Sequence, residues 1–138
     1  MLKSVPINQY RIFTVEDDAD DRDFLKDAFD ENGCAEELHH FFTYEALFLY
    51  INTLPNDKLP HLIILDNQVQ GTNGKTAVES IKGNPRLANI KLALYSSCLQ
   101  DRVKTDCVAH GVNLCLEKGN SLQAIKEDVS RFYRLMEE

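Results

Sequence analysis

The feature that most constrains the fold of this chain is an apolar run that ends on a single carboxylate. Residues 61–65 read His-Leu-Ile-Ile-Leu, and Asp66 follows at once. An uninterrupted apolar run of this length is typical of a strand that is buried on both faces, as strands in parallel sheets are. Helices must then cover both faces of the sheet, so the run predicts an α/β fold with Asp66 at the carboxyl end of a central strand.

The rest of the chain alternates between strand-like and helix-like patterns. Strand patterns occupy residues 10–15, 38–42, 61–65, 90–95 and 114–117. Apolar residues at helical spacing follow each strand pattern, Asp18 or Asp20 and Thr43 can act as N-caps, and the final helix is expected to start at Ser121. Right-handed crossovers between such units predict a doubly wound, flavodoxin-like sheet of five parallel strands in the order 2-1-3-4-5.

Length and charge restrict the organisation and the partners. The 138 residues fit one domain, 1–138, with residues 1–9 as a short N-terminal extension. The net charge of −7 argues against a nucleic acid partner, and 11 of the 22 acidic residues lie between Glu16 and Glu37. No segment resembles a signal peptide or a membrane span, so we expect a cytoplasmic protein without membrane contacts. The four cysteines lack the spacing of a zinc site.

Chemically active side chains follow several of the predicted strands. The carboxyl ends of parallel strands meet at one edge of the sheet, and this edge would hold Glu16, Asp17, Asp66, Ser96 and Lys118. Carboxylates gathered in one cleft repel each other unless a cation is present, and hard oxygen ligands suit Mg²⁺. With Mg²⁺ and a lysine to neutralise charge, a carboxylate can accept a phosphoryl group.

Simpler roles compete for the same residues. Acids in the first turn of a helix are favoured by the helix dipole, which suffices to explain Asp18, Asp20 and Asp21. Ser96 and Ser97 could each cap the following helix, and we favour Ser96 for the site. The four histidines show no ligand spacing, and we expect them to pack or to lie on the surface.

These motifs together resemble the receiver domains of two-component response regulators. The matching parts are Glu16-Asp17-Asp18 after the first strand, Leu65-Asp66 before a loop with two glycines, Ser96-Ser97, and Glu117-Lys118. The resemblance extends from about residue 10 to the last helix. It implies a stand-alone, chemotaxis-regulator-like signalling domain rather than a metabolic enzyme.

The resemblance also implies the roles of the individual residues. Asp66 would accept a phosphoryl group from a histidine kinase or a histidine phosphotransfer protein. The Mg²⁺ ligands would be Asp17 directly, Glu16 through water, Asp66, and the backbone carbonyl of Gln68. Ser96 would donate a hydrogen bond to the phosphoryl group, and Lys118 would pair with it. A downstream protein would bind the fourth helix, fifth strand and fifth helix, and phosphorylation would allow a homodimer.

Three residues depart from the pattern of these domains. Gln70 and Gly119 stand where prolines are common, which loosens the loops after Asp66 and Lys118. Cys115 stands where an aromatic residue often couples the site to the outer surface. The main alternative is therefore a degenerate receiver that binds a partner constitutively.

Two further functions are less well supported. A haloacid-dehalogenase-type phosphatase would need an acid two residues after its nucleophile, where this chain has Gln68. A flavodoxin-like flavin or nucleotide binder would need a phosphate-binding loop after the first strand, but this loop is acidic and lacks glycine.

Overall fold

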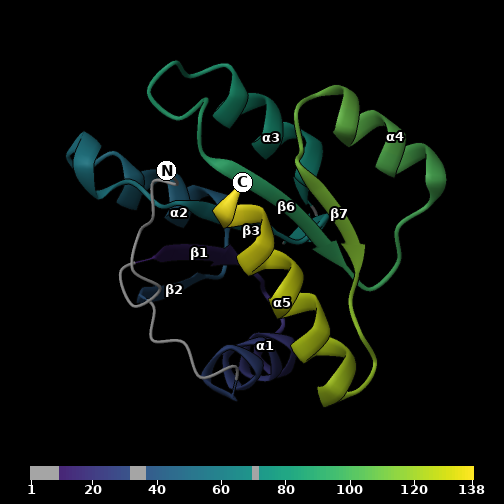
Figure 1. Ribbon diagram of the computed structural model, residues 1–138. Coiled ribbons are helices and arrows are strands. Elements are labelled where there is room, and N and C mark those ends of the chain that lie inside the picture. The colour runs from purple at the N-terminus through teal and green to yellow at the C-terminus, as the bar shows by residue number, and fades with distance from the viewer. Residues whose placement is uncertain (1–9, 32–36, 70–71) are drawn as a thin grey trace.

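The fold is a single five-stranded parallel sheet with helices on both faces (Figure 1). The computed structural model describes residues 10–31, 37–69 and 72–138. Its sheet consists of β2 (Glu37–Phe41), β1 (Arg11–Val15), β3 (Leu62–Leu65), β6 (Lys91–Ser96) and β7 (Leu114–Glu117), in that spatial order. This order is 2-1-3-4-5 when only the strands of the main sheet are counted, so the predicted fold is confirmed.

The helices divide between the two faces of the sheet. They are α1 (Ala19–Glu31), α2 (Tyr44–Ile51), α3 (Gly74–Lys82), α4 (Asp101–Ala109) and α5 (Leu122–Glu137). In Figure 1, α1 and α5 lie together on one side, and α2, α3 and α4 lie on the other. This division follows from the strand order: the β1-to-β2 crossover runs one way across the sheet and the later crossovers run the other way, and right-handed crossovers in opposite directions place their helices on opposite faces.

Two hydrophobic cores hold these layers together. The core under α1 and α5 is rich in aromatic residues, with the rings of Phe29 and Phe132 stacked at 6.3 Å and Tyr95 edge-on to Phe132 at 5.2 Å. The core under α2, α3 and α4 is mainly aliphatic, with Leu47, Val78 and similar side chains fully buried. The central strand β3 contributes to both cores because its successive side chains point to opposite faces.

Side-chain caps define where several helices begin. Asp18, rather than Asp20, caps α1, since its Oδ1 accepts from the backbone N–H groups of Asp20 and Asp21 at 2.9 and 3.1 Å. Thr43 caps α2 through a hydrogen bond of 3.0 Å, as predicted, and Ser121, where the last helix was expected to start, caps α5 through one of 3.1 Å. Expected features at residues 1–9, Gly33, Gln70 and Gly71 lie outside the described residues.

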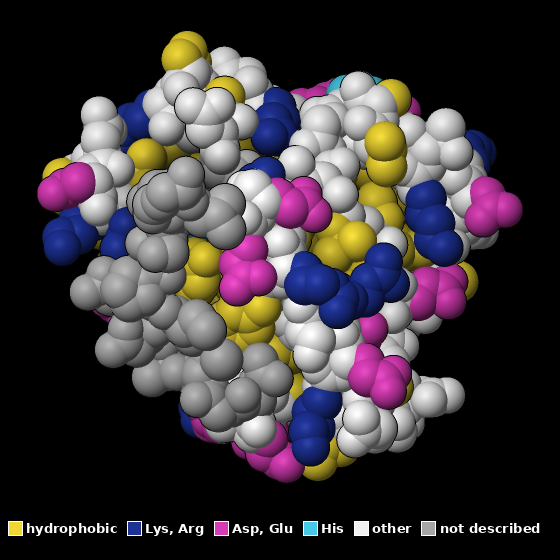
Figure 2. Space-filling model, in the orientation of Figure 1, with side chains coloured by type: hydrophobic (Ala, Val, Ile, Leu, Met, Phe, Trp, Pro, Cys, Tyr) yellow, Lys and Arg dark blue, Asp and Glu magenta, His cyan; other side chains and the backbone are white. Residues whose placement is uncertain are grey.

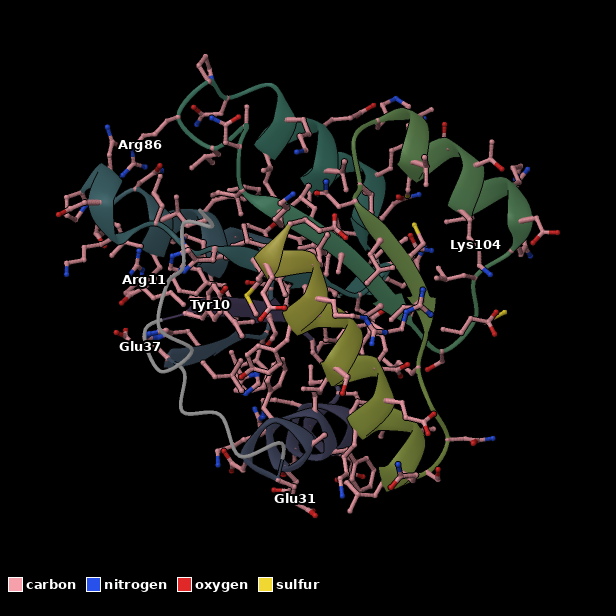
Figure 3. All side chains as sticks on the ribbon, in the orientation of Figure 1. Tyr10, Arg11, Glu31, Glu37, Arg86 and Lys104 are labelled. Carbon is pink, nitrogen blue, oxygen red and sulfur yellow. The ribbon has the colours of Figure 1, made fainter. Side chains whose placement is uncertain are left out.

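Two elements were not predicted. The loop after Asp66 contains a small antiparallel pair, β4 (Gln68–Val69) with β5 (Thr72–Asn73). A short 3₁₀ helix, Asn56–Lys58, follows α2. Arg86 reaches toward this region (Figure 3), where its Nε donates to Asn56 Oδ1 at 2.6 Å and its Nη1 to the carbonyl of Ile51 at 3.2 Å.

Candidate functional site

Asp66 lies at the carboxyl end of β3 with both carboxylate oxygens engaged. Its backbone N–H still donates to the carbonyl of Val15 at 3.1 Å, so the sheet places the residue. Oδ1 accepts from Ser96 Oγ at 2.8 Å and from the backbone N–H of Gln68 at 3.3 Å, and Oδ2 accepts from Lys118 Nζ at 2.8 Å. Asp66 is only 8% exposed, so its carboxylate is largely shielded from solvent.

Lys118 is the common partner of three carboxylates. Its Nζ donates to Oδ2 of Asp66 and to Oδ2 of Asp21, each at 2.8 Å, and also to Oε1 of Glu16. Its backbone N–H donates to the carbonyl of Ser96 at 2.8 Å, which extends the pairing of β6 and β7. The carboxyl ends of β1, β3, β6 and β7 therefore lie close to one ammonium group. About a hundred residues of chain separate the ends of β1 and β7.

The charges in this cluster shift the pKa values of its members in different directions. Burial, together with the charge of Asp66, raises the pKa of Glu16 to about 7 against the opposing effect of the Lys118 hydrogen bond. Burial alone would raise the pKa of Asp66, but the hydrogen bond and charge of Lys118 outweigh it and lower this pKa. Burial would lower the pKa of Lys118, but its hydrogen bonds to Asp21, Asp66 and Glu16 raise it. The lowered pKa keeps the Asp66 carboxyl group in its charged form.

The donor atoms at this edge have the chemistry of a hard-cation site. Glu16 and Asp66 both accept from the Lys118 ammonium group, Asp17 is exposed beside Glu16, and Gln68 lies two residues after Asp66. Within the described ranges, no group of three or more His, Cys, Asp or Glu side chains is already arranged to hold a metal. Oxygen donors with excess negative charge fit Mg²⁺ or Mn²⁺, with water completing the coordination.

Sequence reasoning missed two residues of this site. Asp21 was explained by the helix dipole, yet its side chain binds Lys118. The signal was its place in the first turn of α1, which begins shortly after the end of β1. Tyr44, at the start of α2, donates its hydroxyl to the carbonyl of Asp66. Burial, with the charges of Asp66, Asp17 and Glu16, raises the pKa of Tyr44, so its hydroxyl remains a donor.

The serines and the three unusual residues have different surroundings. Ser96 is buried and its hydroxyl donates to Asp66, whereas Ser97 is exposed. Gly119 donates its N–H to Oδ2 of Asp128 at 3.1 Å. Cys115 is half-buried against the core under α2, α3 and α4. Gln70 lies outside the described residues.

A hollow of about 530 Å³ opens beside Lys118 between the first turns of α1 and α5. Its lining combines polar groups near the site with apolar side chains farther out, among them Phe24 and Leu122. These two side chains are 53% and 43% exposed. An apolar rim next to a charged group is the kind of surface on which another protein can dock.

Comparison with solved structures identifies the fold. The chain is similar to the phosphorylated cyanobacterial phytochrome response regulator RcpA, with a TM-score of 0.82 and 21% identity over 93% of this chain and 94% of that one. It is similar to the Mn²⁺-bound response regulator Rcp1, with a TM-score of 0.79 and 21% identity over 94% and 95% of the two chains. A receiver domain of a signal transduction histidine kinase from Syntrophus aciditrophicus matches with a TM-score of 0.74 and 21% identity over 92% and 89%.

The structural matches are response regulators and receiver domains, and the chain has the receiver-domain fold over more than nine-tenths of its length. The sequence itself matches no family model and no curated protein. Among the described helices, none combines the length and the apolar character needed to cross a membrane.

Proposed function

We propose that this chain is a Mg²⁺-dependent signalling switch that accepts a phosphoryl group on Asp66. The donor is a histidine kinase or a histidine phosphotransfer protein, and the output is a contact with another protein in the cytoplasm. The domain acts by changing partners and not by turning over a metabolite, although it takes part in its own phosphorylation and dephosphorylation.

The observation that supports this function best is the arrangement around the Asp66 carboxylate. One oxygen accepts from Ser96 Oγ and the other from Lys118 Nζ, both at 2.8 Å. Hydrogen-bond donors on both sides of a buried anion are suited to hold the oxygens of a group attached to it. A carboxylate that only capped a turn would not need a lysine and a serine from two other strands.

The proposed transfer follows from this geometry. An oxygen of Asp66 attacks phosphorus in line, forming an O–P bond while the N–P bond of phosphohistidine breaks. The electron pair of that bond stays on the imidazole, which leaves neutral when its other nitrogen carries a proton. Ser96 and Lys118 then donate to phosphoryl oxygens in place of the carboxylate.

Charge balance supports a metal requirement. The single positive charge of Lys118 faces the three carboxylates of Glu16, Asp21 and Asp66, and the transferred group brings further negative charge. Glu16, Asp17, Asp66 and the carbonyl of Gln68 are the proposed protein ligands of Mg²⁺. The bound cation would neutralise charge on the phosphoryl oxygens and orient them.

The direct test is incubation of the chain with acetyl phosphate and Mg²⁺, followed by mass spectrometry of the intact protein. We expect a gain of one phosphoryl group that is absent in Asp66→Asn and absent when EDTA removes Mg²⁺. Asp101→Asn, a change of an exposed acid in the first turn of α4, is the matched control and should gain the group normally. A wild-type chain that gains no phosphoryl group from any donor would refute the proposal.

A degenerate receiver with a constitutive binding surface is the second candidate. Gln70, Gly119 and Cys115 favour it, because they remove features that commonly stiffen or couple the site. The same mass measurement separates the two functions, since a degenerate receiver takes up no phosphoryl group. Sustained hydrolysis of a phosphomonoester would instead indicate a phosphatase, which Gln68 argues against.

The hollow beside Lys118 is the proposed docking place for the donor protein. It opens toward the site, and its rim includes Phe24 and Leu122. Phe24→Ser should slow transfer from a phosphorylated donor protein while leaving transfer from acetyl phosphate unchanged. Equal loss with both donors would show that Phe24 supports the fold instead.

The proposed output surface consists of α4, β7 and α5. Figure 2 shows Lys and Arg side chains gathered over β7 and α5, next to exposed hydrophobic atoms. Arg131 and Arg134 are exposed on α5, and Lys104 on α4 is labelled in Figure 3. Such a surface suits a downstream partner with acidic and apolar residues, or a second copy of this chain in a homodimer.

A further inference from the structure

A carboxylate outside the acidic cluster joins the two strand ends that supply Ser96 and Lys118. Oδ2 of Asp128, on the second turn of α5, accepts from the hydroxyl of Tyr95 at 2.7 Å and from the backbone N–H of Gly119 at 3.1 Å. Tyr95 directly precedes Ser96 in β6, and Gly119 directly follows Lys118. One oxygen atom of α5 therefore contacts the immediate neighbour of each phosphoryl-binding side chain.

The turn after Lys118 lacks the restraint that a proline ring would give it. Gly119 lacks both the ring of a proline and a side chain, so its backbone dihedral angles are intrinsically free. Lys118 is tied to β6 on one side by its N–H bond to the carbonyl of Ser96. On the other side, the bond from Gly119 to Asp128 is the tie between this turn and α5.

Close packing explains why the residue at this turn is glycine. A Cβ atom at position 119 would lie 2.6 Å from Cβ of Ala124 and 2.9 Å from the backbone nitrogen of Ile125. The turn thus lies directly on the first turn of α5, near enough for its N–H to reach Asp128. Glycine allows the turn to lie this close to α5 but does not itself restrict the backbone. The hydrogen bond from the Gly119 N–H to Asp128 supplies a restraint.

Tyr95 strengthens the same anchor from the sheet. The residue is 4% exposed, and its ring packs edge-on against Phe132 of α5. Burial, followed by the hydrogen bond to Asp128, raises the pKa of Tyr95, which favours the protonated hydroxyl that donates to Asp128. A buried hydroxyl that donates to a carboxylate is a strong and directional contact.

We propose that Asp128 is a positioning residue that holds the Lys118–Gly119 turn, and with it the Lys118 ammonium group, beside Asp66. The Asp128 carboxylate restricts the backbone after Lys118, as a proline at position 119 would otherwise do. It acts through the backbone of Gly119 and through Tyr95, and it does not touch the phosphoryl group. The catalytic part of this inference rests on the proposed phosphorylation of Asp66.

The test compares Asp128→Ala with Asp128→Asn, because asparagine keeps an oxygen that can accept from both donors. We expect Asp128→Ala to slow phosphorylation by acetyl phosphate about 10-fold or more, since small misplacements of catalytic groups have effects of this size. Asp128→Asn should stay within about threefold of wild type, as expected when acceptor geometry matters more than charge. Glu127→Ala, at the exposed neighbouring acid on α5, is the matched control and should not change the rate.

Binding measurements separate positioning from general damage to the fold. Lys118 competes with a cation for Glu16 and Asp66, so Asp128→Ala should bind Mg²⁺ at least as tightly as wild type in calorimetry while binding beryllofluoride more weakly. Equal losses of Mg²⁺ and beryllofluoride affinity would overturn the proposal, as would a wild-type phosphorylation rate in Asp128→Ala. Impairment of Asp128→Asn as severe as that of Asp128→Ala would also overturn it.

Failure of the proposed function would be recognised separately, because the wild-type chain would then gain no phosphoryl group. In that case, hydrogen exchange of the Gly119 amide decides whether Asp128 anchors the turn. Faster exchange in Asp128→Ala than in Glu127→Ala supports the anchor, and unchanged exchange overturns it.

Discussion

The two helices that flank β7 are held to the sheet very differently. Helix α5 buries five side chains, among them Phe132 and Tyr133, and its aromatic rings pack against those of α1 and β6. Helix α4 buries only Cys107, with Val103 partly buried against the same core. The layer formed by α1, α5 and the sheet face beneath them is therefore firmly packed, and we call it the platform. Helix α4 packs on the opposite face with little buried apolar area.

The other contacts of α4 are exposed or polar. An ion pair of 3.2 Å joins Lys75 of α3 to Asp106, and both side chains are more than 40% exposed. The loop before α4 is tied to β7 by a hydrogen bond of 3.1 Å from the N–H of Leu99 to the Glu117 carboxylate. Exposed ion pairs contribute at most about 1 kcal/mol each, so α4 should move at lower cost than α5.

This difference indicates where a change at Asp66 could be transmitted. Ser96, which binds Asp66, is the last residue of β6, and the chain passes from it into the loop that precedes α4. A shift of Ser96 toward a phosphoryl group would therefore pull on the less firmly held helix. Typical allosteric couplings of about 1–3 kcal/mol would suffice to change its position or its mobility.

The largest effect should come from truncating the platform. Phe132→Ala removes a fully buried ring between α1 and β6 and should lower the free energy of unfolding by about 3–5 kcal/mol. Urea denaturation followed by circular dichroism measures this change. Val108→Ala on α4, at a side chain that is 58% exposed, is the control and should change stability by less than about 0.5 kcal/mol. Comparable losses in the two variants would contradict the contrast between α5 and α4.

An intermediate effect should come from pH, again through the platform. Burial, together with the charges of Arg22 and Lys26 on α1, lowers the pKa of His40 from 6.5 to about 4. A folded-state pKa below the unfolded value means that His40 stabilises the fold above pH 6.5 and that this contribution is lost as pH falls toward 4. The loss should reach about 2–3 kcal/mol.

Denaturation at pH 7, 6, 5 and 4 measures this dependence. His40→Asn keeps a nitrogen or oxygen near the Thr14 hydroxyl, which lies 2.5 Å from His40 Nδ1, and should remove most of the loss. His39→Asn, at the neighbouring histidine beside Phe13 and Tyr50, should retain it. An unchanged pH profile in His40→Asn would show that other groups cause the acid sensitivity.

The smallest effect should come from the anchor of α4. Cys107→Ala removes one buried sulfur atom and should lower stability by about 1 kcal/mol. Because α4 is held by so little else, we expect its amides to exchange faster in this variant while those of α5 do not change. Cys98→Ala, at an exposed cysteine, is the control. Equally accelerated exchange in α4 and α5 would mean that the two helices open together.

The main features of the fold could be predicted because they depend on residue periodicity. The apolar run before Asp66 required burial on both faces, and the turn and cap residues separated the strands from the helices. Thr43 was a predictable cap, and Ser121 a predictable helix start, because such side chains bind backbone groups three residues away. The β4–β5 pair escaped prediction because two-residue strands have no measurable alternation.

The site was only partly predictable. Strand ends are visible in the sequence, so Asp66, Ser96 and Lys118 could be expected at one edge, and the structure brings them together. Asp21 and Tyr44 lie one turn or one element beyond the strand ends, where side-chain direction depends on how the helices pack. Asp128 acts from the middle of α5, and no local pattern distinguishes it from the exposed acids of that helix.

The tight contact at Gly119 also limits how this protein can change over generations. Proline at position 119 would lose the N–H that binds Asp128, and its Cβ would collide with Ala124 and with backbone atoms of α5. Shortening Ala124 to glycine would leave the backbone collisions in place, at 2.8 and 2.9 Å. The single substitution Gly119→Pro would therefore not fit the present backbone of this turn. The glycine and the carboxylate on α5 form a coupled pair, and any lineage that carries one is expected to keep the other.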